Sequence, residues 1–123
     1  MTAPETSTFC WPLTGPPRLD EGAVCRLVQD VVAAIFTVPQ EQMRAGSRGR
    51  APAAFARQVA MYLTHVVLGL NYSATGRRFH RDRTTVAYAC RVVEDRRDNP
   101  QTDVLLQALE DALGAFARAG VRP

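Results

Sequence analysis

Hydrophobic residues recur every three or four positions along most of the chain, which is the spacing of one face of an α-helix. The clearest case covers residues 20–36, where the apolar positions are Val24, Leu27, Val28, Val31, Val32, Ile35 and Phe36. The chain has no strand-like alternation of apolar and polar residues, no hairpin turn signal and no repeat of the solenoid kind. The sequence therefore predicts an all-α fold of five to six helices.

Capping and helix-breaking residues set the predicted bounds in the first half of the chain. Asp20 is a good N-cap for the first helix, and Thr37 with Pro39 predicts a short second helix, capped by Thr37, that runs to about residue 45. Pro52 then begins a long helix, which Gly69 ends. The apolar stripe of this long helix comprises Phe55, Val59, Tyr62, Leu63, Val66 and Val67.

The second half of the chain predicts a short helix, a tight turn and two longer helices. We expect the short helix over residues 73–79 and the turn at His80 and Arg81. Asp82 is then the expected N-cap of the next helix. Pro100 breaks the pattern, and a last helix follows it. The apolar faces of the two longer helices comprise Val86, Ala89, Cys90 and Val93 in the first and Leu105, Leu109, Leu113 and Phe116 in the second.

The first 19 residues differ in composition from the rest of the chain. They hold four prolines together with several Ser and Thr residues, so residues 1–19 predict a flexible N-terminal arm. A chain of 123 residues is long enough for about one domain. We assign residues 20–119 to that domain.

Several functional classes are disfavoured by what the sequence lacks. No apolar run approaches the roughly 18 residues of a membrane span, and the N-terminus lacks a signal-peptide layout, so we expect a cytoplasmic protein with no membrane partner. The spacing of Cys10, Cys25 and Cys90 does not match that of a metal site. Cys25 and Cys90 fall on predicted apolar helix faces, so we expect both to be core residues. The two histidines, His65 and His80, are not arranged with a nucleophile or with a pair of carboxylates, as a catalytic site would require. The sequence also has no glycine-rich phosphate-binding loop. We therefore expect a protein that is not an enzyme and has no metal or cofactor.

Charge is distributed unevenly along the chain. The net charge is only +3, and all 15 basic residues are arginines. Residues 44–91 contain nine arginines and one acid, a net charge of +8, whereas the remainder is acidic. A basic block of this kind is typical of a surface that binds a polyanion, although a solvated basic face is the plainer alternative.

The predicted short helix, turn and longer helix form the geometry of a helix-turn-helix. In such motifs the N-terminal residues of the second helix enter the major groove of DNA. Here that helix opens with Asp82, Arg83, Thr84 and Thr85, and Arg77, Arg78 and Arg81 precede it. The helix N-terminus also presents backbone amides that suit a phosphate. These features favour binding of double-stranded DNA.

Residues 56–63 (ARQVAMYL) and 76–86 (GRRFHRDRTTV) carry a family resemblance. They resemble the signature of the DNA-binding domain of the bacterial replication initiator DnaA, and the resemblance covers about residues 20–117. It implies a helical fold, similar to that of the Trp repressor, that reads a short duplex site as a monomer. It also implies that the basic loop before the long helix reaches an adjacent minor groove.

The resemblance implies roles for individual residues. Arg57, Gln58 and Thr85 match positions that contact phosphates, and Asp82 and Thr84 match positions that contact bases. Arg81 matches the signature arginine. The remaining candidates are Arg77 before the turn, Tyr88, which replaces a histidine that touches the DNA backbone, and Arg48 and Arg50, which correspond approximately to the basic residues of the loop.

Besides Tyr88, two further departures from the signature fall on the turn and at the start of the second helix. The histidine before the two threonines is Arg83 here, and the two glycines before the signature arginine are reduced to His80. Arginine is the preferred bidentate partner of guanine, so we expect Arg83 to favour a guanine.

The expected function is that of a sequence-specific transcription regulator, similar to the DnaA-like part of the activators of gene transfer agent or phage-like gene clusters. About 20 residues precede the first predicted helix, so we expect the DNA-reading domain without an ATPase module. RNA polymerase or another transcription factor is an expected partner, and the nucleoid the expected location. Two alternatives stay open: a replication-control factor that competes for initiator sites, and an adaptor that docks proteins through its acidic last helix.

Overall fold

The computed structural model describes residues 20–39, 41, 43 and 51–120. This part of the chain is all-α, as predicted, and has no strand. Its helices are α2 (Glu21–Phe36), α4 (Ala51–Leu68), α5 (Tyr72–Phe79), α6 (Arg83–Arg96) and α7 (Pro100–Gly120). The predicted arm at residues 1–19 and most of the predicted short second helix lie outside the described residues, although Glu41 and Met43 are helical.

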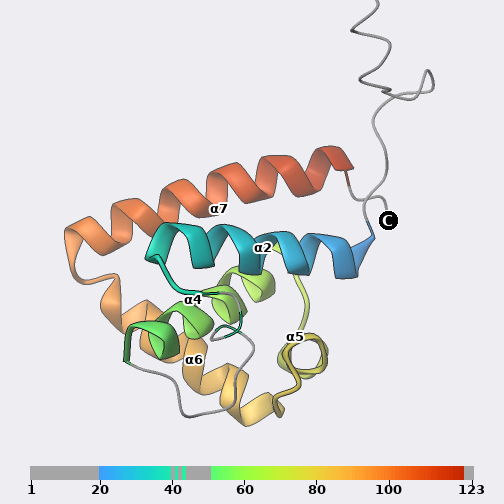
Figure 1. Cartoon of the computed structure of the whole chain (residues 1–123), viewed down its shortest axis with the longest axis horizontal. Coiled ribbons are helices and arrows are strands. Elements are labelled where there is room, and N and C mark those ends of the chain that lie inside the picture. The colour runs from blue at the N-terminus through green and yellow to red at the C-terminus, as the bar shows by residue number, and fades with distance from the viewer. Residues whose placement is uncertain (1–19, 40, 42, 44–50, 121–123) are drawn as a thin grey trace, which may run out of the picture.

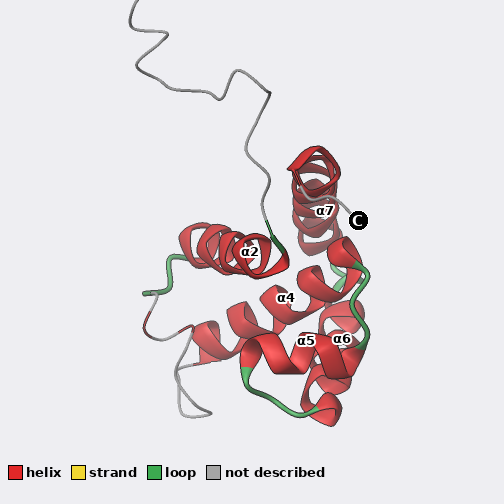
Figure 2. Cartoon of the chain, turned by 90° about the vertical axis from the view of Figure 1, so that its right-hand side faces the viewer, coloured by secondary structure: helices red, strands yellow, loops and turns green. Residues whose placement is uncertain are grey.

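The long helix α4 lies at the centre and packs against all four of the other helices (Figures 1 and 2). Alanines on its surface allow these neighbours to approach closely. Its buried residues therefore extend well beyond the predicted stripe, while Val66, which was predicted to be apolar core, is 41% exposed. The buried set comprises Ala53, Ala56, Arg57, Val59, Ala60, Met61, Tyr62, Leu63 and Thr64.

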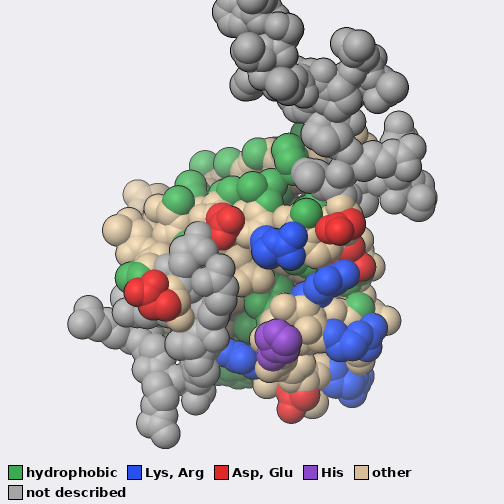
Figure 3. All heavy atoms as spheres, turned by 45° about the vertical axis from the view of Figure 1, so that its right-hand side comes forward, with side chains coloured by type: hydrophobic (Ala, Val, Ile, Leu, Met, Phe, Trp, Pro, Cys, Tyr) green, Lys and Arg blue, Asp and Glu red, His purple; other side chains and the backbone are tan. Residues whose placement is uncertain are grey.

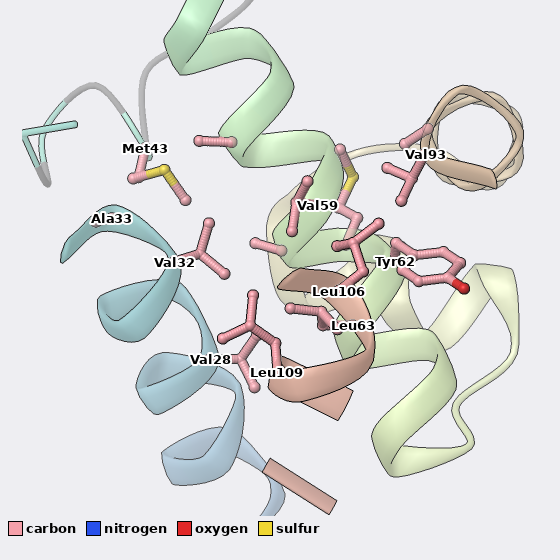
Figure 4. Close-up of a cluster of buried hydrophobic side chains, with 14 of the residues drawn as sticks. Val28, Val32, Ala33, Met43, Val59, Tyr62, Leu63, Val93, Leu106 and Leu109 are labelled. Carbon is pink, nitrogen blue, oxygen red and sulfur yellow. The ribbon is translucent and has the colours of Figure 1, made fainter. Parts of the chain in front are cut away.

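The core is made of side chains that converge on α4 from α2, α6 and α7 (Figure 4). The predicted core face of α6 is confirmed, since Val86, Ala89, Cys90 and Val93 are all buried. Burial raises the pKa of the Cys25 and Cys90 thiols to about 11. Both cysteines therefore remain protonated at neutral pH and act as small apolar residues, as predicted.

The buried face of α7 agrees with the predicted one in its middle and differs at both ends. Leu109 and Leu113 are buried as expected, but Leu106 and Ala117 complete the face, and Phe116 is 43% exposed. The spacing i, i+3, i+4 allows either set. The packing against α4 decides which side of the helix faces inward.

Side-chain caps begin four of the helices. The carboxylate of Asp20 accepts the Ala23 N–H at 2.7 Å, and that of Asp82 accepts the Thr85 N–H at 2.9 Å, which confirms both predicted N-caps. Asn71 and Asn99 cap α5 and α7 in the same way. Each cap satisfies an N–H group that the helix itself leaves without a partner.

The prediction that Thr37 caps a second helix is wrong. Thr37 ends α2 instead, with φ at 56° in the left-handed region. The next residue, Val38, donates its N–H to the Ala33 carbonyl at 2.9 Å and is 8% exposed. This is the Schellman arrangement, in which a hydrophobic residue after the helix packs back on it. Burial of Val38 offsets the cost of holding the β-branched Thr37 in this conformation.

A half-buried arginine joins α7 to the rest of the fold. Arg97, between α6 and α7, forms ion pairs with Asp103 at 2.5 Å and with Glu110, and donates to the Tyr62 hydroxyl at 2.9 Å. The Arg97 side chain is 17% exposed. Burial alone would lower its pKa, but the bonds to Asp103 and Glu110 outweigh burial and raise it.

We expect Arg97→Ala to lower the free energy of unfolding by about 2–3 kcal/mol, because it leaves the partly buried Glu110 carboxylate without its partner. Urea denaturation measures this loss. Arg118→Ala is the matched control, since it removes an exposed arginine from α7, and we expect it to change stability by less than about 0.5 kcal/mol. Equal effects of the two substitutions would contradict the role of Arg97.

Candidate DNA-binding site

The chain forms the predicted helix-turn-helix from α5, a turn at residues 80–82 and α6. The turn is tight because two backbone segments nearly touch. The Arg81 N–H donates to the Gly76 carbonyl at 2.9 Å, and a Cβ added at Gly76 would lie 2.3 Å from the Arg81 carbonyl oxygen. Only glycine therefore fits at position 76. His80 turns the chain with φ at 58°, a conformation that glycine adopts more readily.

Asp82 connects the turn to the first turn of α6. Its Oδ1 accepts both the Thr85 N–H and the Thr84 hydroxyl, each at 2.9 Å. The bonds from Thr85 and then from Thr84 lower the pKa of this carboxyl. The carboxylate is therefore ionised at neutral pH, and the N-terminal end of α6 is held in one arrangement.

Most of the predicted DNA-contacting residues lie close together on this motif. The structure places Arg77 on the last turn of α5, Arg81 and Asp82 in the turn, and the other candidates on the first two turns of α6. Arg77 and the α6 candidates are solvent-exposed, and Tyr88 is 61% exposed. The α6 candidates are Arg83, Thr84, Thr85 and Tyr88. Figure 3 shows arginine side chains gathered on the face turned toward the viewer.

Two further candidates, Arg57 and Gln58, come from α4. Arg57 is only 7% exposed, and Gln58 is half-buried. Burial lowers the pKa of Arg57, and the nearby charge of Arg81 lowers it further. No pattern in the sequence indicates this burial, because position 57 lies outside the predicted apolar stripe. Arg48 and Arg50 lie outside the described residues.

A hollow of about 210 Å³ brings Arg57 and Arg81 together with residues from other parts of the chain, one of which, Arg26, the sequence did not link to the site. Arg26 from α2 and Arg78 from α5 also line it, along with Asp30. Arg26 precedes the motif by about 50 residues, so no local pattern links them. The packing of α2 beside the turn places it there.

In the described part of the chain, no group of three or more His, Cys, Asp or Glu residues is arranged to hold a metal ion. None of the described helices has the length and apolar character needed to cross a membrane.

Comparison with known proteins decides the family. The family model described as the bacterial DnaA protein helix-turn-helix matches residues 25–93, more than half of the chain. The chain belongs to this family. It carries a DNA-binding helix-turn-helix of the DnaA type, and the resemblance predicted from its sequence is confirmed.

Two of the similar proteins are chromosomal replication initiators of the DnaA family. The chain is 32% identical over 117 residues to the chromosomal replication initiator protein DnaA of Gloeobacter violaceus, covering 94% of this chain and 26% of that protein. The DnaA of Mesorhizobium japonicum is 39% identical over 84 residues, covering 68% of this chain and 16% of that protein. The DnaA-type chain thus spans about a quarter or less of these relatives.

A solved structure supports the same fold. The crystal structure of a DNA replication initiation factor matches with a TM-score of 0.69 and 28% sequence identity. The match covers 78% of this chain and 30% of the other.

Gly76→Ala is expected to lower the free energy of unfolding by about 2–3 kcal/mol, because the added methyl group meets the Arg81 carbonyl and no flexible side chain can move away. Thermal or urea unfolding measures the loss. Ser73→Ala, at an exposed position of the same helix, is the control and should change stability by less than about 0.5 kcal/mol. Wild-type stability of the Gly76 variant would show that the turn is not constrained as described.

Proposed function

We propose that this DnaA-type domain binds a specific double-stranded DNA site as a monomer and regulates transcription, without enzymatic activity. The observation that carries the proposal is the exposed polar face at the start of α6, formed by Arg83, Thr84 and Thr85 on a capped helix behind a tight turn. A rigid scaffold that presents polar side chains at the start of the second helix suits base readout in the major groove.

The identity of the reading residues favours transcription over replication control. A protein that competes for initiator sites should keep the reading residues of the initiator. Here Arg83 stands in place of the signature histidine, at an exposed position where its guanidinium is available to a base. The specific regulatory role that we propose is activation of a gene transfer agent or phage-like gene cluster. The partner in this role would be RNA polymerase or another transcription factor.

Selection of bound sequences from a random duplex library tests the target site. We expect an enriched motif that survives near-physiological salt and contains a guanine at the Arg83 position, because arginine makes two hydrogen bonds to O6 and N7 of guanine. In a parallel selection, Arg83→His should lose that guanine preference. An unchanged motif would contradict the proposed contact, and a wild-type motif identical to initiator sites would favour replication control.

Two substitutions separate base readout from phosphate binding. Thr84→Ala should reduce discrimination between the selected site and unrelated duplex by about 0.5–1.5 kcal/mol, the contribution of a single hydrogen bond. Arg77→Ala, at an exposed position before the turn, should weaken binding to both duplexes alike and reduce the slope of log affinity against log salt by about 1. Arg77 is a better probe than Arg57, because loss of the buried Arg57 side chain would also disturb the fold. Fluorescence anisotropy titrations measure both effects, and equal loss of discrimination in both variants would refute this division.

A further inference from the structure

Arg78, on the last turn of α5, reaches across to the start of α2. Its Nη2 donates to Glu21 Oε1 at 3.0 Å, and each side chain is 40% exposed. The guanidinium lies directly against the first turn of α2, because a Cβ added at Gly22 would stand 3.0 Å from Arg78 Nη1. One arginine of the helix-turn-helix is thus held by an acidic residue from outside the motif.

The position of Arg78 is one where DNA would pass. In helix-turn-helix proteins the first helix crosses the DNA backbone while the second enters the groove. Arg78 is on the end of the first helix next to the turn, beside the exposed Arg77. It also lines the hollow that contains Arg57 and Arg81, two of the residues assigned to the DNA surface.

The bond between Arg78 and Glu21 is of a kind that DNA can break. An ion pair between exposed side chains stabilises a fold only weakly, because water and salt screen both charges. Duplex DNA, in contrast, carries a phosphate charge about every 1.7 Å along its axis, and each phosphate neutralised by an arginine releases counterions. A phosphate close to Arg78 therefore competes well with a single carboxylate.

We propose that Arg78 is a further phosphate-binding residue, and that Glu21 competes with duplex DNA for it in the free protein. This inference rests on the proposed DNA-binding function. A contact between Arg78 and a phosphate does not depend on the base sequence. Because Glu21 competes for Arg78, α2 lowers the affinity for every duplex by the same factor and leaves base readout unchanged. The ratio of specific to nonspecific binding is then set by α6, while the overall affinity is adjusted from α2.

A double-mutant cycle on the full chain tests the exchange, with anisotropy titrations of a labelled mixed-sequence duplex between about 50 and 200 mM salt. We expect Glu21→Gln to raise affinity about two- to fivefold, the range that corresponds to an exposed ion pair. We expect Arg78→Gln to lower affinity and to reduce the salt slope by about 1, and Arg78→Lys to retain most of the affinity.

The sign of the coupling decides between two arrangements in the complex. If Arg78 moves to a phosphate, the gain from Glu21→Gln should be at least about twofold larger in the wild-type background than in the Arg78→Gln background. If Arg78 stays on Glu21, the gain should instead be larger in the Arg78→Gln background, where Glu21 is left as an unpaired negative charge near DNA. That result, or equal gains in the two backgrounds, would overturn the inference.

Two controls separate this inference from other causes. Asp111→Asn removes one negative charge from α7, away from the motif, and should change affinity by less than Glu21→Gln does. Thermal unfolding should show that each variant is folded, as expected for exposed positions. Binding of the wild type without the expected coupling overturns only the role of Arg78 and Glu21. Absence of duplex binding by the wild type would overturn the proposed function as well.

Discussion

Burial of the middle of α4 on every side, from Val59 to Thr64, is the constraint on which the other helices depend. A helix that is packed from several sides has little surface left for charged groups, and its neighbours must share the space around it. The small residues Ala53, Ala56 and Ala60 leave room for them. Because α2, α5, α6 and α7 all rest on this one helix, the reading end of α6 is fixed relative to α2, although few direct contacts join those two elements.

The sequence predicted the fold class, the order of the described helices and the helix-turn-helix, because these depend on local signals. These signals are the helical spacing of apolar residues, the N-caps Asp20 and Asp82, and the helix terminator Gly69. Each of them acts on backbone within a few residues of its own position. Thr37 shows the limit of such signals, since its hydroxyl is equally suited to begin a helix. The burial of Val38 in the hydrophobic core, directly after the left-handed Thr37, decided that Thr37 ends one.

Tertiary packing also explains why the candidate site was predicted only in part. The residues at the start of α6 are contiguous in sequence, so the motif alone located them. Other features of the site depend on how α2 and α4 pack beside the turn. This packing buries Arg57 and places Arg26 and Arg78 around one hollow. The inward face of α7 was ambiguous for the same reason. Leu105 and Leu106 both satisfy the helical spacing, and only the partner helix distinguishes them.

The bond between Thr84 and Asp82 limits which bases Thr84 can recognise. Because Asp82 is ionised, its carboxylate has no proton to give, and the Thr84 hydroxyl must be the donor in this bond. While the bond is kept, Thr84 has only oxygen lone pairs and a methyl group to present to a base. It can accept from the amino group of adenine or cytosine and can pack against the methyl group of thymine, but it cannot donate to guanine O6 or thymine O4. A capping interaction that fixes the helix end thereby also sets the hydrogen-bonding polarity of the surface that faces DNA.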